Sequence, residues 1–331
     1  MSALLDPANV RASVAAAGLL SPERPVVVML SGGRDSVCLL DLAVEIGGRA
    51  AVNAVHCNYA LREGADEDEA LCVALCSALG VALAVTRPRR LSAKDGASSG
   101  NLQAWARDVR YSAAFELAAA PGFAGGDQAL VATGHTASDQ AETILYRLAA
   151  SPGRRALLGM AARRGSLIRP LLALSREQTA EYCRQRGLSW REDPSNADPT
   201  FARARVRHQL LAALRSVHPS AEASIVRTAA ELREEAELLD GLVDRELHGE
   251  AAIALERLRV LPVALARLVV RRLAEQACGA HAPDAATRLV ELRSLGHADG
   301  RRAELHLSGG LRAIVESGRL RFEHVGAAEV S

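Results

Sequence analysis

The sequence predicts an α/β fold, in which a parallel sheet is covered by helices on both faces, followed by a smaller α+β domain. In the first half of the chain, short runs rich in β-branched residues alternate with longer segments of helical periodicity, which is the pattern of βαβ units. Beyond about residue 215 the sequence becomes helix-rich. Because 331 residues are enough for two folding units, we expect domains at 1–215 and 216–331.

The first domain is expected to alternate strands and helices. The expected strands are Pro25–Leu30, Ala50–His56, Val81–Val85 and Ala129–Thr133. The expected helices are Val37–Ile46, Asp66–Leu79, Leu102–Ala119 and Asp139–Ala149. Arg89–Gly100 and Gly122–Gly126 have the composition of surface loops. Because ligands of such sheets bind at the carboxyl ends of the strands, the motifs at Ser31, His56 and Gly134, which we place just after strand ends, form the candidate site.

The second domain is expected to be helix-rich, with two short strands near its end. Helical periodicity covers Ser220–Leu242 and Leu258–Gln276. The runs Ala303–Leu307 and Leu311–Val315 read as strands on either side of a pair of glycines. This pattern indicates a small α+β domain.

Composition favours a soluble protein of the cytoplasm. The six cysteines include no C-x-x-C pair and lie mostly in apolar runs, so we expect buried free thiols and a reducing compartment. No stretch approaches the roughly 18 apolar residues that a membrane span requires, and the first residues lack the basic and apolar regions of a secretion signal.

Charge is distributed unevenly along the chain. The formal net charge is +1, but residues 151–215 contain thirteen arginines against five acidic residues, a local surplus of eight positive charges. Such a basic surface is compatible with a polyanionic partner. Because Lys94 is the one lysine in the chain, a general bias of composition towards arginine is the alternative explanation.

A compact turn rich in glycine follows the first expected strand. Its sequence is Ser31-Gly32-Gly33-Arg34-Asp35-Ser36, and a helical segment begins directly after it. Two glycines permit positive φ and leave main-chain N–H groups open, while the helix start adds unpaired donors. The serine hydroxyls add donors, and Asp35 is placed to hold Mg²⁺ against phosphates. The alternative is a capped helix after a tight turn.

A second motif opens the helix after the fourth expected strand. Asp139 and Glu142 are three residues apart, so their carboxylates share one helix face close to His135 in the preceding loop. Two carboxylates and an imidazole form a candidate site for a cationic amine or a metal. A capping box from Thr136 to Asp139 is the alternative, but it accounts for neither Glu142 nor His135.

The string S-G-G-x-D-S resembles the pyrophosphate loop of the N-type ATP pyrophosphatases, which share the adenine nucleotide α-hydrolase-like fold. It is not a Walker A loop, because it lacks G-K-[ST]. The resemblance implies that ATP is split between its α and β phosphates, with an adenylated intermediate and release of pyrophosphate.

Further stretches resemble one family within this group, the tRNA(Ile)-lysidine synthases. Ala132–Thr143 is similar to the family's H-x-x-D-D-Q-x-E-T motif. The other similar stretches, in chain order, are His56–Arg62, Ala106–Tyr111, Arg169–Leu172, Trp190–Asn196 and Phe201–Arg207, followed by a terminal G-G-L-R hairpin. The departures from the family's usual residues are Ser138 for Asp, Gln103 for Glu, Tyr59 for His and Ala204 for Asn. Ser138 removes a carboxylate, but Asp35, Asp139 and Glu142 remain, so we expect activity to survive.

The resemblance implies a cytoplasmic ligase that uses ATP and Mg²⁺ to attach L-lysine to a cytidine in the CAU anticodon of isoleucine tRNA. On the nucleotide side, it implies that Ser31, Gly32, Gly33, Arg34 and Ser36 hold the ATP phosphates, and that Asp35 and Asp139 hold Mg²⁺. His56 and Asn58 line the nucleotide pocket or, alternatively, simply close the second strand.

On the transfer side, the resemblance implies that Asp139 and Glu142 recognise lysine. His135 is a candidate for proton transfer because the pKa of free histidine lies near neutrality. The arginines implied to bind phosphate of ATP or tRNA are Arg107, Arg110, Arg203 and Arg207. A solvated helix face or an internal salt bridge is the alternative for each. Asp193 and Asn196 read first as turn-formers.

The sequence leaves several partners and activities open. The C-terminal domain is expected to grip the body of the tRNA, and a homodimer stays compatible with the sequence. The same ATP loop also fits a tRNA thiolase, an amidotransferase-type ligase or a nucleotide-binding module without chemistry.

Overall fold

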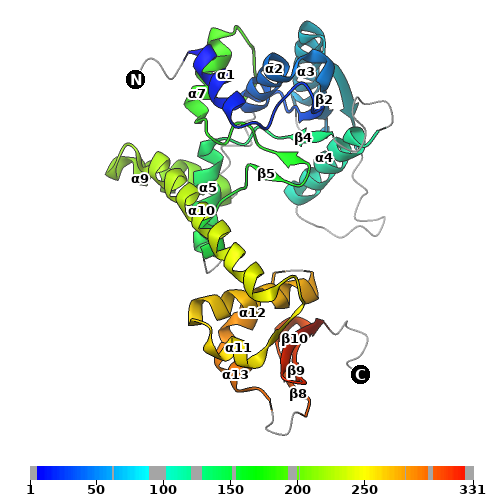
Figure 1. Ribbon diagram of the computed structural model, residues 1–331. Coiled ribbons are helices and arrows are strands. Elements are labelled where there is room, and N and C mark those ends of the chain that lie inside the picture. The colour runs from blue at the N-terminus through cyan, green and yellow to red at the C-terminus, as the bar shows by residue number, and fades with distance from the viewer. Residues whose placement is uncertain are drawn as a thin grey trace. The chain divides into compact units, whose positions relative to one another are not determined.

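The chain forms two compact units in the computed structural model, Met1–Ala230 and Glu231–Ser331 (Figure 1). The structure describes residues 6–61, 63–88, 102–120, 129–150, 154–192, 200, 202–279, 281–296 and 301–324. The boundary between the units falls inside helix α10 (Ala221–Leu247), a helix that the sequence analysis counted entirely with the second domain. The roles given to the two domains stay predictions. The two expected surface loops lie outside the described residues.

A mostly parallel sheet forms the centre of the first unit. Its strands lie in the order β3-β2-β1-β4-β6-β5. Their bounds are β1 Val26–Met29, β2 Val52–Cys57, β3 Ala82–Thr86, β4 Leu130–Ala132, β5 Arg163–Arg164 and β6 Leu167–Ile168. All neighbouring pairs are parallel except β5 with β6. The four expected strands are therefore confirmed, whereas the β5–β6 pair was not foreseen, because two-residue strands show no periodicity.

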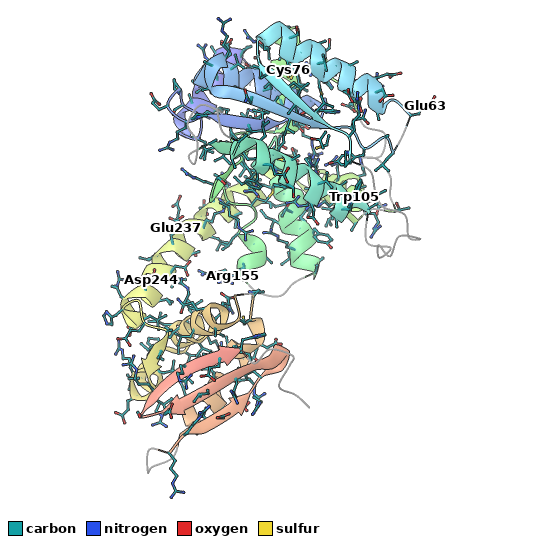
Figure 2. The ribbon with its side chains drawn as sticks, turned by 90° about the vertical axis from the view of Figure 1, so that its right-hand side faces the viewer. Glu63, Cys76, Trp105, Arg155, Glu237 and Asp244 are labelled. Atoms are coloured by element: carbon teal, nitrogen blue, oxygen red, sulfur yellow. The ribbon has the colours of Figure 1, made fainter. Side chains whose placement is uncertain are left out.

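Helices cover both faces of this sheet. Their bounds are α1 Pro7–Ala16, α2 Arg34–Gly47, α3 Ala65–Leu79, α4 Leu102–Ala118, α5 Ala137–Ala150, α6 Arg154–Leu157, α7 Arg176–Gln185, α8 Ala202–Arg205 and α9 Leu211–Val217. A π-helical turn, Val206–Leu210, joins α8 to α9. Figure 2 shows α3, which carries Cys76, and α4, which carries Trp105, on opposite sides of the strands.

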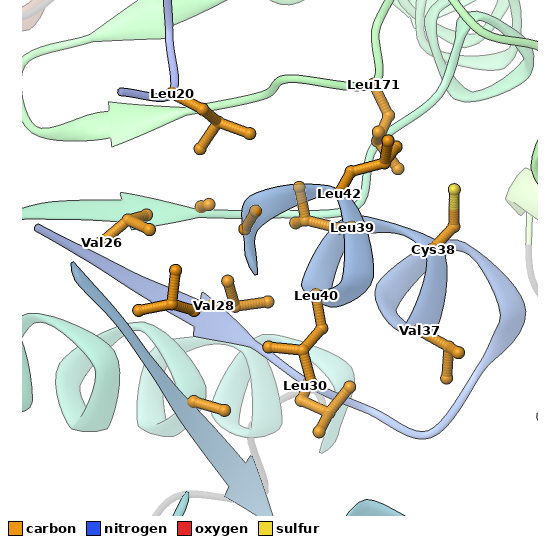
Figure 3. Close-up of a cluster of buried hydrophobic side chains, with 14 of the residues drawn as sticks. Leu20, Val26, Val28, Leu30, Val37, Cys38, Leu39, Leu40, Leu42 and Leu171 are labelled. Carbon is orange, nitrogen blue, oxygen red and sulfur yellow. The ribbon is translucent and has the colours of Figure 1, made fainter. Parts of the chain in front are cut away.

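The side chains of β1 alternate between two apolar cores, as expected for a strand covered on both faces. Val26 and Val28 pack with the apolar side of α2, including Leu39 and Leu42 (Figure 3). The alternate residues of β1 pack instead with Ala114 of α4 on the other face. Each fully buried side chain of this size contributes about 1.5–3 kcal/mol relative to exposure, so the two cores fix β1 and the turn that follows it.

The strand order creates a switch point beside β1. β1 pairs with β2 on one side and with β4 on the other, although β2 follows β1 in the chain and β4 comes much later. Ligands of doubly wound sheets bind outside the carboxyl ends of the strands at such a switch point. The Ser31 turn leaves β1 and the Gly134 loop leaves β4 at this place.

The second unit is a small antiparallel sheet with helices packed against it. The strand order is β7-β10-β9-β8. The bounds are β7 Ala252–Ala254, β8 Ala303–His306, β9 Leu311–Glu316 and β10 Arg319–His324 for strands, and α11 Leu255–Val260, α12 Val263–Cys278 and α13 Leu289–Ser294 for helices, with short 3-10 turns at Pro283–Arg288 and Ser308–Gly310. The two expected strands are present, but the single helix expected over Leu258–Gln276 was wrong. It breaks at Leu261, because Pro262 lacks the N–H that a continuous helix needs and instead occupies the position just before α12.

The six cysteines are free thiols, as expected, and Cys38, Cys72, Cys76 and Cys183 are buried. Among the helices in the described ranges, none combines the length and the apolar character needed to cross a membrane.

Candidate active site

The turn after β1 is shaped by its own serine hydroxyls. Ser31 N–H donates to Ser36 Oγ at 3.1 Å, and the Ser36 hydroxyl donates to the Gly33 carbonyl at 2.8 Å. Gly32 has φ +80°, in the region that favours glycine. In the described part of the chain, the N–H groups of Gly32, Arg34 and Asp35 have no hydrogen-bond partner. The turn therefore presents open donors at the start of α2, the arrangement that binds an anion.

Gly134 brings the second motif against this turn. A Cβ at Gly134 would lie 2.9 Å from the Asp35 carbonyl oxygen and 3.1 Å from Ser36 N. Only glycine permits this approach, because both neighbouring atoms belong to the main chain. The loop before α5 and the first turn of α2 consequently touch, and the two motifs form one site.

Three predicted carboxylates, Asp35, Asp139 and Glu142, meet around one guanidinium that the sequence analysis missed. Arg176 Nη1 lies 2.6 Å from Glu142 Oε1, and its Nε lies 3.8 Å from Asp35 Oδ2. Its Nη2 pairs with Asp139 Oδ1. Arg207 also contacts Glu142, with Nε 2.7 Å from Oε1 and Nη2 3.0 Å from Oε2. Arg207 lies in the π-helical turn, a feature that is frequent at functional sites.

The first turns of α2, α5 and α7 supply Asp35, Asp139 and Arg176, and hydrogen bonds connect these parts of the chain. Thr179 of α7 donates its hydroxyl hydrogen to Asp35 Oδ1 at 2.5 Å. Ala137 N–H, at the start of α5, donates to the Leu174 carbonyl at 2.8 Å. Helix N-termini favour negative charge through their open N–H groups and dipoles, so the site stabilises carboxylates or phosphates.

The pKa values of the two aspartates shift in opposite directions. Burial raises the pKa of Asp35, and the nearby charge of Asp139 adds to the increase. Burial also favours a higher pKa for Asp139, but Arg176 and the hydrogen bonds from Thr136 outweigh it, so the pKa of Asp139 is lowered. Thr136 donates to Asp139 Oδ2 from both its N–H and its hydroxyl at 2.9 Å. The capping interaction considered above therefore exists, and Asp139 contacts Arg176 as well.

His135 is a neutral ring at pH 7. Its Nδ1 lies 2.7 Å from Thr133 Oγ1. Burial lowers the pKa of His135 to about 4, against the opposing charge of Asp139, and the nearby positive charges of Arg169, Arg107 and Arg203 contribute to the decrease. The near-neutral pKa on which the sequence argument relied does not hold here. A neutral imidazole remains able to accept a proton or a hydrogen bond.

Arginines form a positive region beside His135. Arg107 lies over the ring of Tyr111, 4.6 Å from its centroid. Arg169, in the R-P-L-L stretch, was not singled out from the sequence. It donates from Nη1 to the Ala161 carbonyl at 2.7 Å, whereas its buried Nε has no partner among the described residues. Arg203 forms no ion pair within the described ranges. These groups provide positive charge for an anionic substrate.

His56 and Asn58 occupy different structural roles. His56 lies inside β2 rather than after it, with Nδ1 2.9 Å from the Leu30 carbonyl oxygen and with Nε2 buried without a partner in the described structure. Asn58 fastens the following turn to α3, because its Nδ2 donates to Asp66 Oδ1 at 2.8 Å and to Glu69 Oε2 at 2.9 Å. Asn58 therefore makes the contacts expected of a residue that closes the second strand.

The remaining residues of the predicted motifs fall into two groups. Arg110 is described, and its Nε is buried without a hydrogen-bond partner among the described residues. The residues that lie outside the described set are Arg62, Asp193, Asn196, Phe201 and the side chain of Gln103.

Comparison with known proteins agrees with this architecture. A family model described as a PP-loop domain matches residues 8–214. A tRNA(Ile)-lysidine synthase of Pseudomonas fluorescens (strain Pf0-1) is 40% identical over 229 residues, which is 66% of this chain and 48% of the relative. This chain therefore spans about half the length of that relative.

A second relative matches along its whole length. The tRNA(Ile)-lysidine synthase of Salinispora tropica is 34% identical over 340 residues and is covered to 99%, as is this chain. Among solved structures, a U34-tRNA thiolase from Methanococcus maripaludis superposes with a TM-score of 0.55 at 18% identity, over 69% of this chain and 79% of that one, a likeness of fold alone. With a PP-loop domain over most of its length and a full-length relative above 30% identity, the chain belongs to the tRNA(Ile)-lysidine synthase family.

Proposed function

We propose that the chain ligates L-lysine to C2 of the wobble cytidine in the CAU anticodon of isoleucine tRNA, converting ATP to AMP and pyrophosphate through an adenylated cytidine. One observation carries the proposal: a turn with open N–H donors touches a largely buried group of carboxylates at the switch point of the sheet. The first suits a triphosphate and the second suits a cationic amine. In the proposed reaction, ATP binds at the turn and lysine binds at the neighbouring carboxylates.

The turn between Ser31 and Ser36 is the proposed site of the ATP phosphates. The open N–H groups of Gly32, Arg34 and Asp35 provide donors without a large rearrangement, because the serine hydroxyls already hold the turn in shape. His56, whose Nε2 is buried without a partner among the described residues, is the proposed contact to the nucleoside.

Mg²⁺ is proposed to bind beside the phosphate turn. Asp35 and Asp139 are hard oxygen ligands close enough for the charge of Asp139 to raise the pKa of Asp35, and Mg²⁺ is usually held by one or two carboxylates together with substrate phosphates. The ion would neutralise negative charge on the pyrophosphate leaving group.

Asp139 and Glu142 are the proposed recognition groups for lysine. Glu142 is 3% exposed, and its pairing with Arg176 and Arg207 supports the proposal that cationic groups bind here. In the first step the C2 oxygen of cytidine attacks the α-phosphorus, and pyrophosphate leaves. In the second, the ε-amine forms a bond to C2, AMP leaves with the oxygen, and the amine loses a proton. His135, neutral at pH 7, is a candidate acceptor of that proton.

The arginine-rich region beside His135 is the proposed contact to tRNA or nucleotide phosphate. Arg107, Arg169 and Arg203 all lie near the imidazole, and arginine suits phosphate through its planar donors. The second unit is proposed to bind the tRNA body, and lysine, the CAU anticodon and a cytoplasmic location remain parts of the proposal.

Thiol chemistry is disfavoured at the buried cysteines. Burial raises the pKa of Cys72 to about 12, and burial likewise raises the pKa of Cys76 to about 11. These thiols stay protonated at neutral pH and are poor nucleophiles. The observation favours a ligase over a thiolase that would use either cysteine.

The test uses purified full-length chain with Mg²⁺-ATP, labelled lysine and isoleucine tRNA bearing a CAU anticodon. Methionine tRNA with the same anticodon is the matched control. We expect label on the isoleucine tRNA alone, with pyrophosphate released in step. Label on neither tRNA rejects the proposed reaction, and label on both rejects the proposed specificity.

A further inference from the structure

A carboxylate that the sequence analysis did not consider lies against Ser138. Glu222, in the first turn of α10, accepts the Ser138 hydroxyl hydrogen at Oε1, 2.6 Å away. Ser138 is 2% exposed, and the Glu222 side chain is 13% exposed. Its second oxygen pairs with Arg215. A hydrogen-bonded carboxylate thus lies beside residue 138, a position where the family usually has an Asp and this chain has a Ser.

Ser138 connects this carboxylate to the main chain of Arg176. The Arg176 N–H donates to Ser138 Oγ at 3.3 Å, while the same hydroxyl donates to Glu222. A hydroxyl that donates to a charged acceptor becomes a better acceptor itself. The contact therefore fixes the first residue of α7, whose side chain bridges Asp139 and Glu142.

We propose that Glu222 is a positioning residue of the site: it supplies, through Ser138, the negative charge that residue 138 lacks, and it holds Arg176 so that Asp139 and Glu142 keep their spacing. This inference rests on the proposed function, because it assigns lysine to those two carboxylates. Glu222 acts through Ser138 and Arg176 and touches no substrate. Loss of its charge alters lysine binding more than ATP binding.

The test is a rescue of one substitution by another. Ser138→Asp places a second carboxylate against Glu222 in a buried setting, where two such groups do not both ionise easily. We expect this variant to melt about 5 °C lower and its KM for lysine to rise about tenfold. Adding Glu222→Gln removes the repulsion and lets the new amide donate to the introduced carboxylate, so the double variant returns to within about twofold of the wild-type KM.

Glu222→Gln alone keeps an oxygen acceptor for Ser138 but loses the charge. We expect its KM for lysine to rise several-fold while its KM for ATP stays within about twofold of the wild-type value, since a hydrogen bond to a charged group is worth more than one to a neutral group. Glu235→Gln is the matched control, because Glu235 is an exposed residue of the same helix. It should change neither constant.

The outcomes separate this inference from the proposed function. If the wild-type protein transfers lysine but the double variant is worse than Ser138→Asp, the inference is overturned and the function stands. A parallel loss in both KM values and in kcat would also overturn it, because that result indicates a general structural defect. If the wild-type protein transfers no lysine, the proposed function fails, and the melting temperatures still decide whether Glu222 and residue 138 share one negative charge.

Discussion

The two units of the chain differ in how deeply their polar side chains are buried. Every polar or charged residue that is buried in the described structure lies in the first unit; these residues are Ser36, Asp41, His56, Asn58, Asp68, Thr133, Thr136, Ser138, Gln140, Glu142, Thr143, Arg169 and Thr179. In the second unit, the side chains of ion pairs such as Arg257 with Glu246 and Arg319 with Glu250 are more exposed than these buried residues of the first unit. Both units have apolar cores, so both have an interior in which polar side chains could be buried.

This contrast shows where the fold accepts an energetic cost. A buried polar group costs free energy unless it is hydrogen-bonded, and a buried charge costs more unless it is paired. Many of the buried polar groups lie at the carboxyl ends of β1 and β4 or on the helices that begin there. The cost is accepted at the switch point of the sheet, where a ligand would use the same groups. The second unit stabilises itself with apolar packing and surface charge.

The largest effect on stability is expected from removing the central guanidinium of the first unit. Arg176→Met leaves Asp139 without its closest cation and Glu142 with Arg207 alone, and removing one partner of a buried pair typically costs about 3–5 kcal/mol. Because Arg207 remains, we expect a value near 3 kcal/mol from urea unfolding. Arg176→Lys keeps the charge and should lose less. A Met variant as stable as wild type would contradict the paired arrangement.

A free-energy effect of similar size, but on catalysis alone, is expected at Asp35. Asp35→Ala removes the proposed Mg²⁺ ligand and should slow pyrophosphate release about 10²–10³-fold, the usual loss for one electrostatic contact to a transition state. Burial already raises the pKa of Asp35, so its charge is not a major source of stability, and the variant should unfold at a similar urea concentration. Full activity in the variant would remove the metal role from this carboxylate.

The next effect depends on pH and comes from His135. Its pKa is lowered to about 4, chiefly by burial, whereas in the unfolded chain it lies near 6.5. Between these values the unfolded state binds the extra proton, so stability falls as pH decreases from about 6.5 towards 4, on the order of 1–2 kcal/mol at pH 5. His135→Gln should flatten this part of the profile of unfolding free energy against pH.

The exposed His324 in β10 is the control for that profile. His324→Gln should leave the slope between pH 6.5 and pH 4 unchanged. An identical slope in wild type and His135→Gln would mean that the buried imidazole does not account for the loss.

Sequence reasoning found the parts of the fold that repeat locally. The alternation of apolar runs predicted β1 to β4 and their helices, because period and length are properties of neighbouring residues. It failed where a few residues decide the outcome. Pro262 divided an expected helix, and the two-residue strands β5 and β6 carry no pattern.

The same distinction applies to the candidate site: residues in local motifs were predicted, and residues brought in from distant parts of the chain were not. Asp35, Asp139, Glu142 and Arg207 were predicted and lie together. Arg176 and Glu222 were missed, although each contacts the predicted residues, because the chain separates Arg176 from Asp139 by 37 positions and Glu222 from Ser138 by 84. A contact across such separations depends on how the helices pack, which no local pattern specifies. A lone arginine after a capping serine gives no signal of its own.

The smallest effect is expected in the second unit, at the ion pairs on α10 and α12. Arg272 of α12 lies 3.0 Å from Asp240 and 2.6 Å from Asp244, which is labelled in Figure 2. Both carboxylates are more than half exposed, so water and salt screen the attraction, and such pairs contribute about 0–1 kcal/mol. Arg272→Ala should therefore change the unfolding free energy by less than about 1 kcal/mol, and less in high salt. A loss as large as that of Arg176→Met would show that charge in the second unit carries the same structural weight as charge at the switch point.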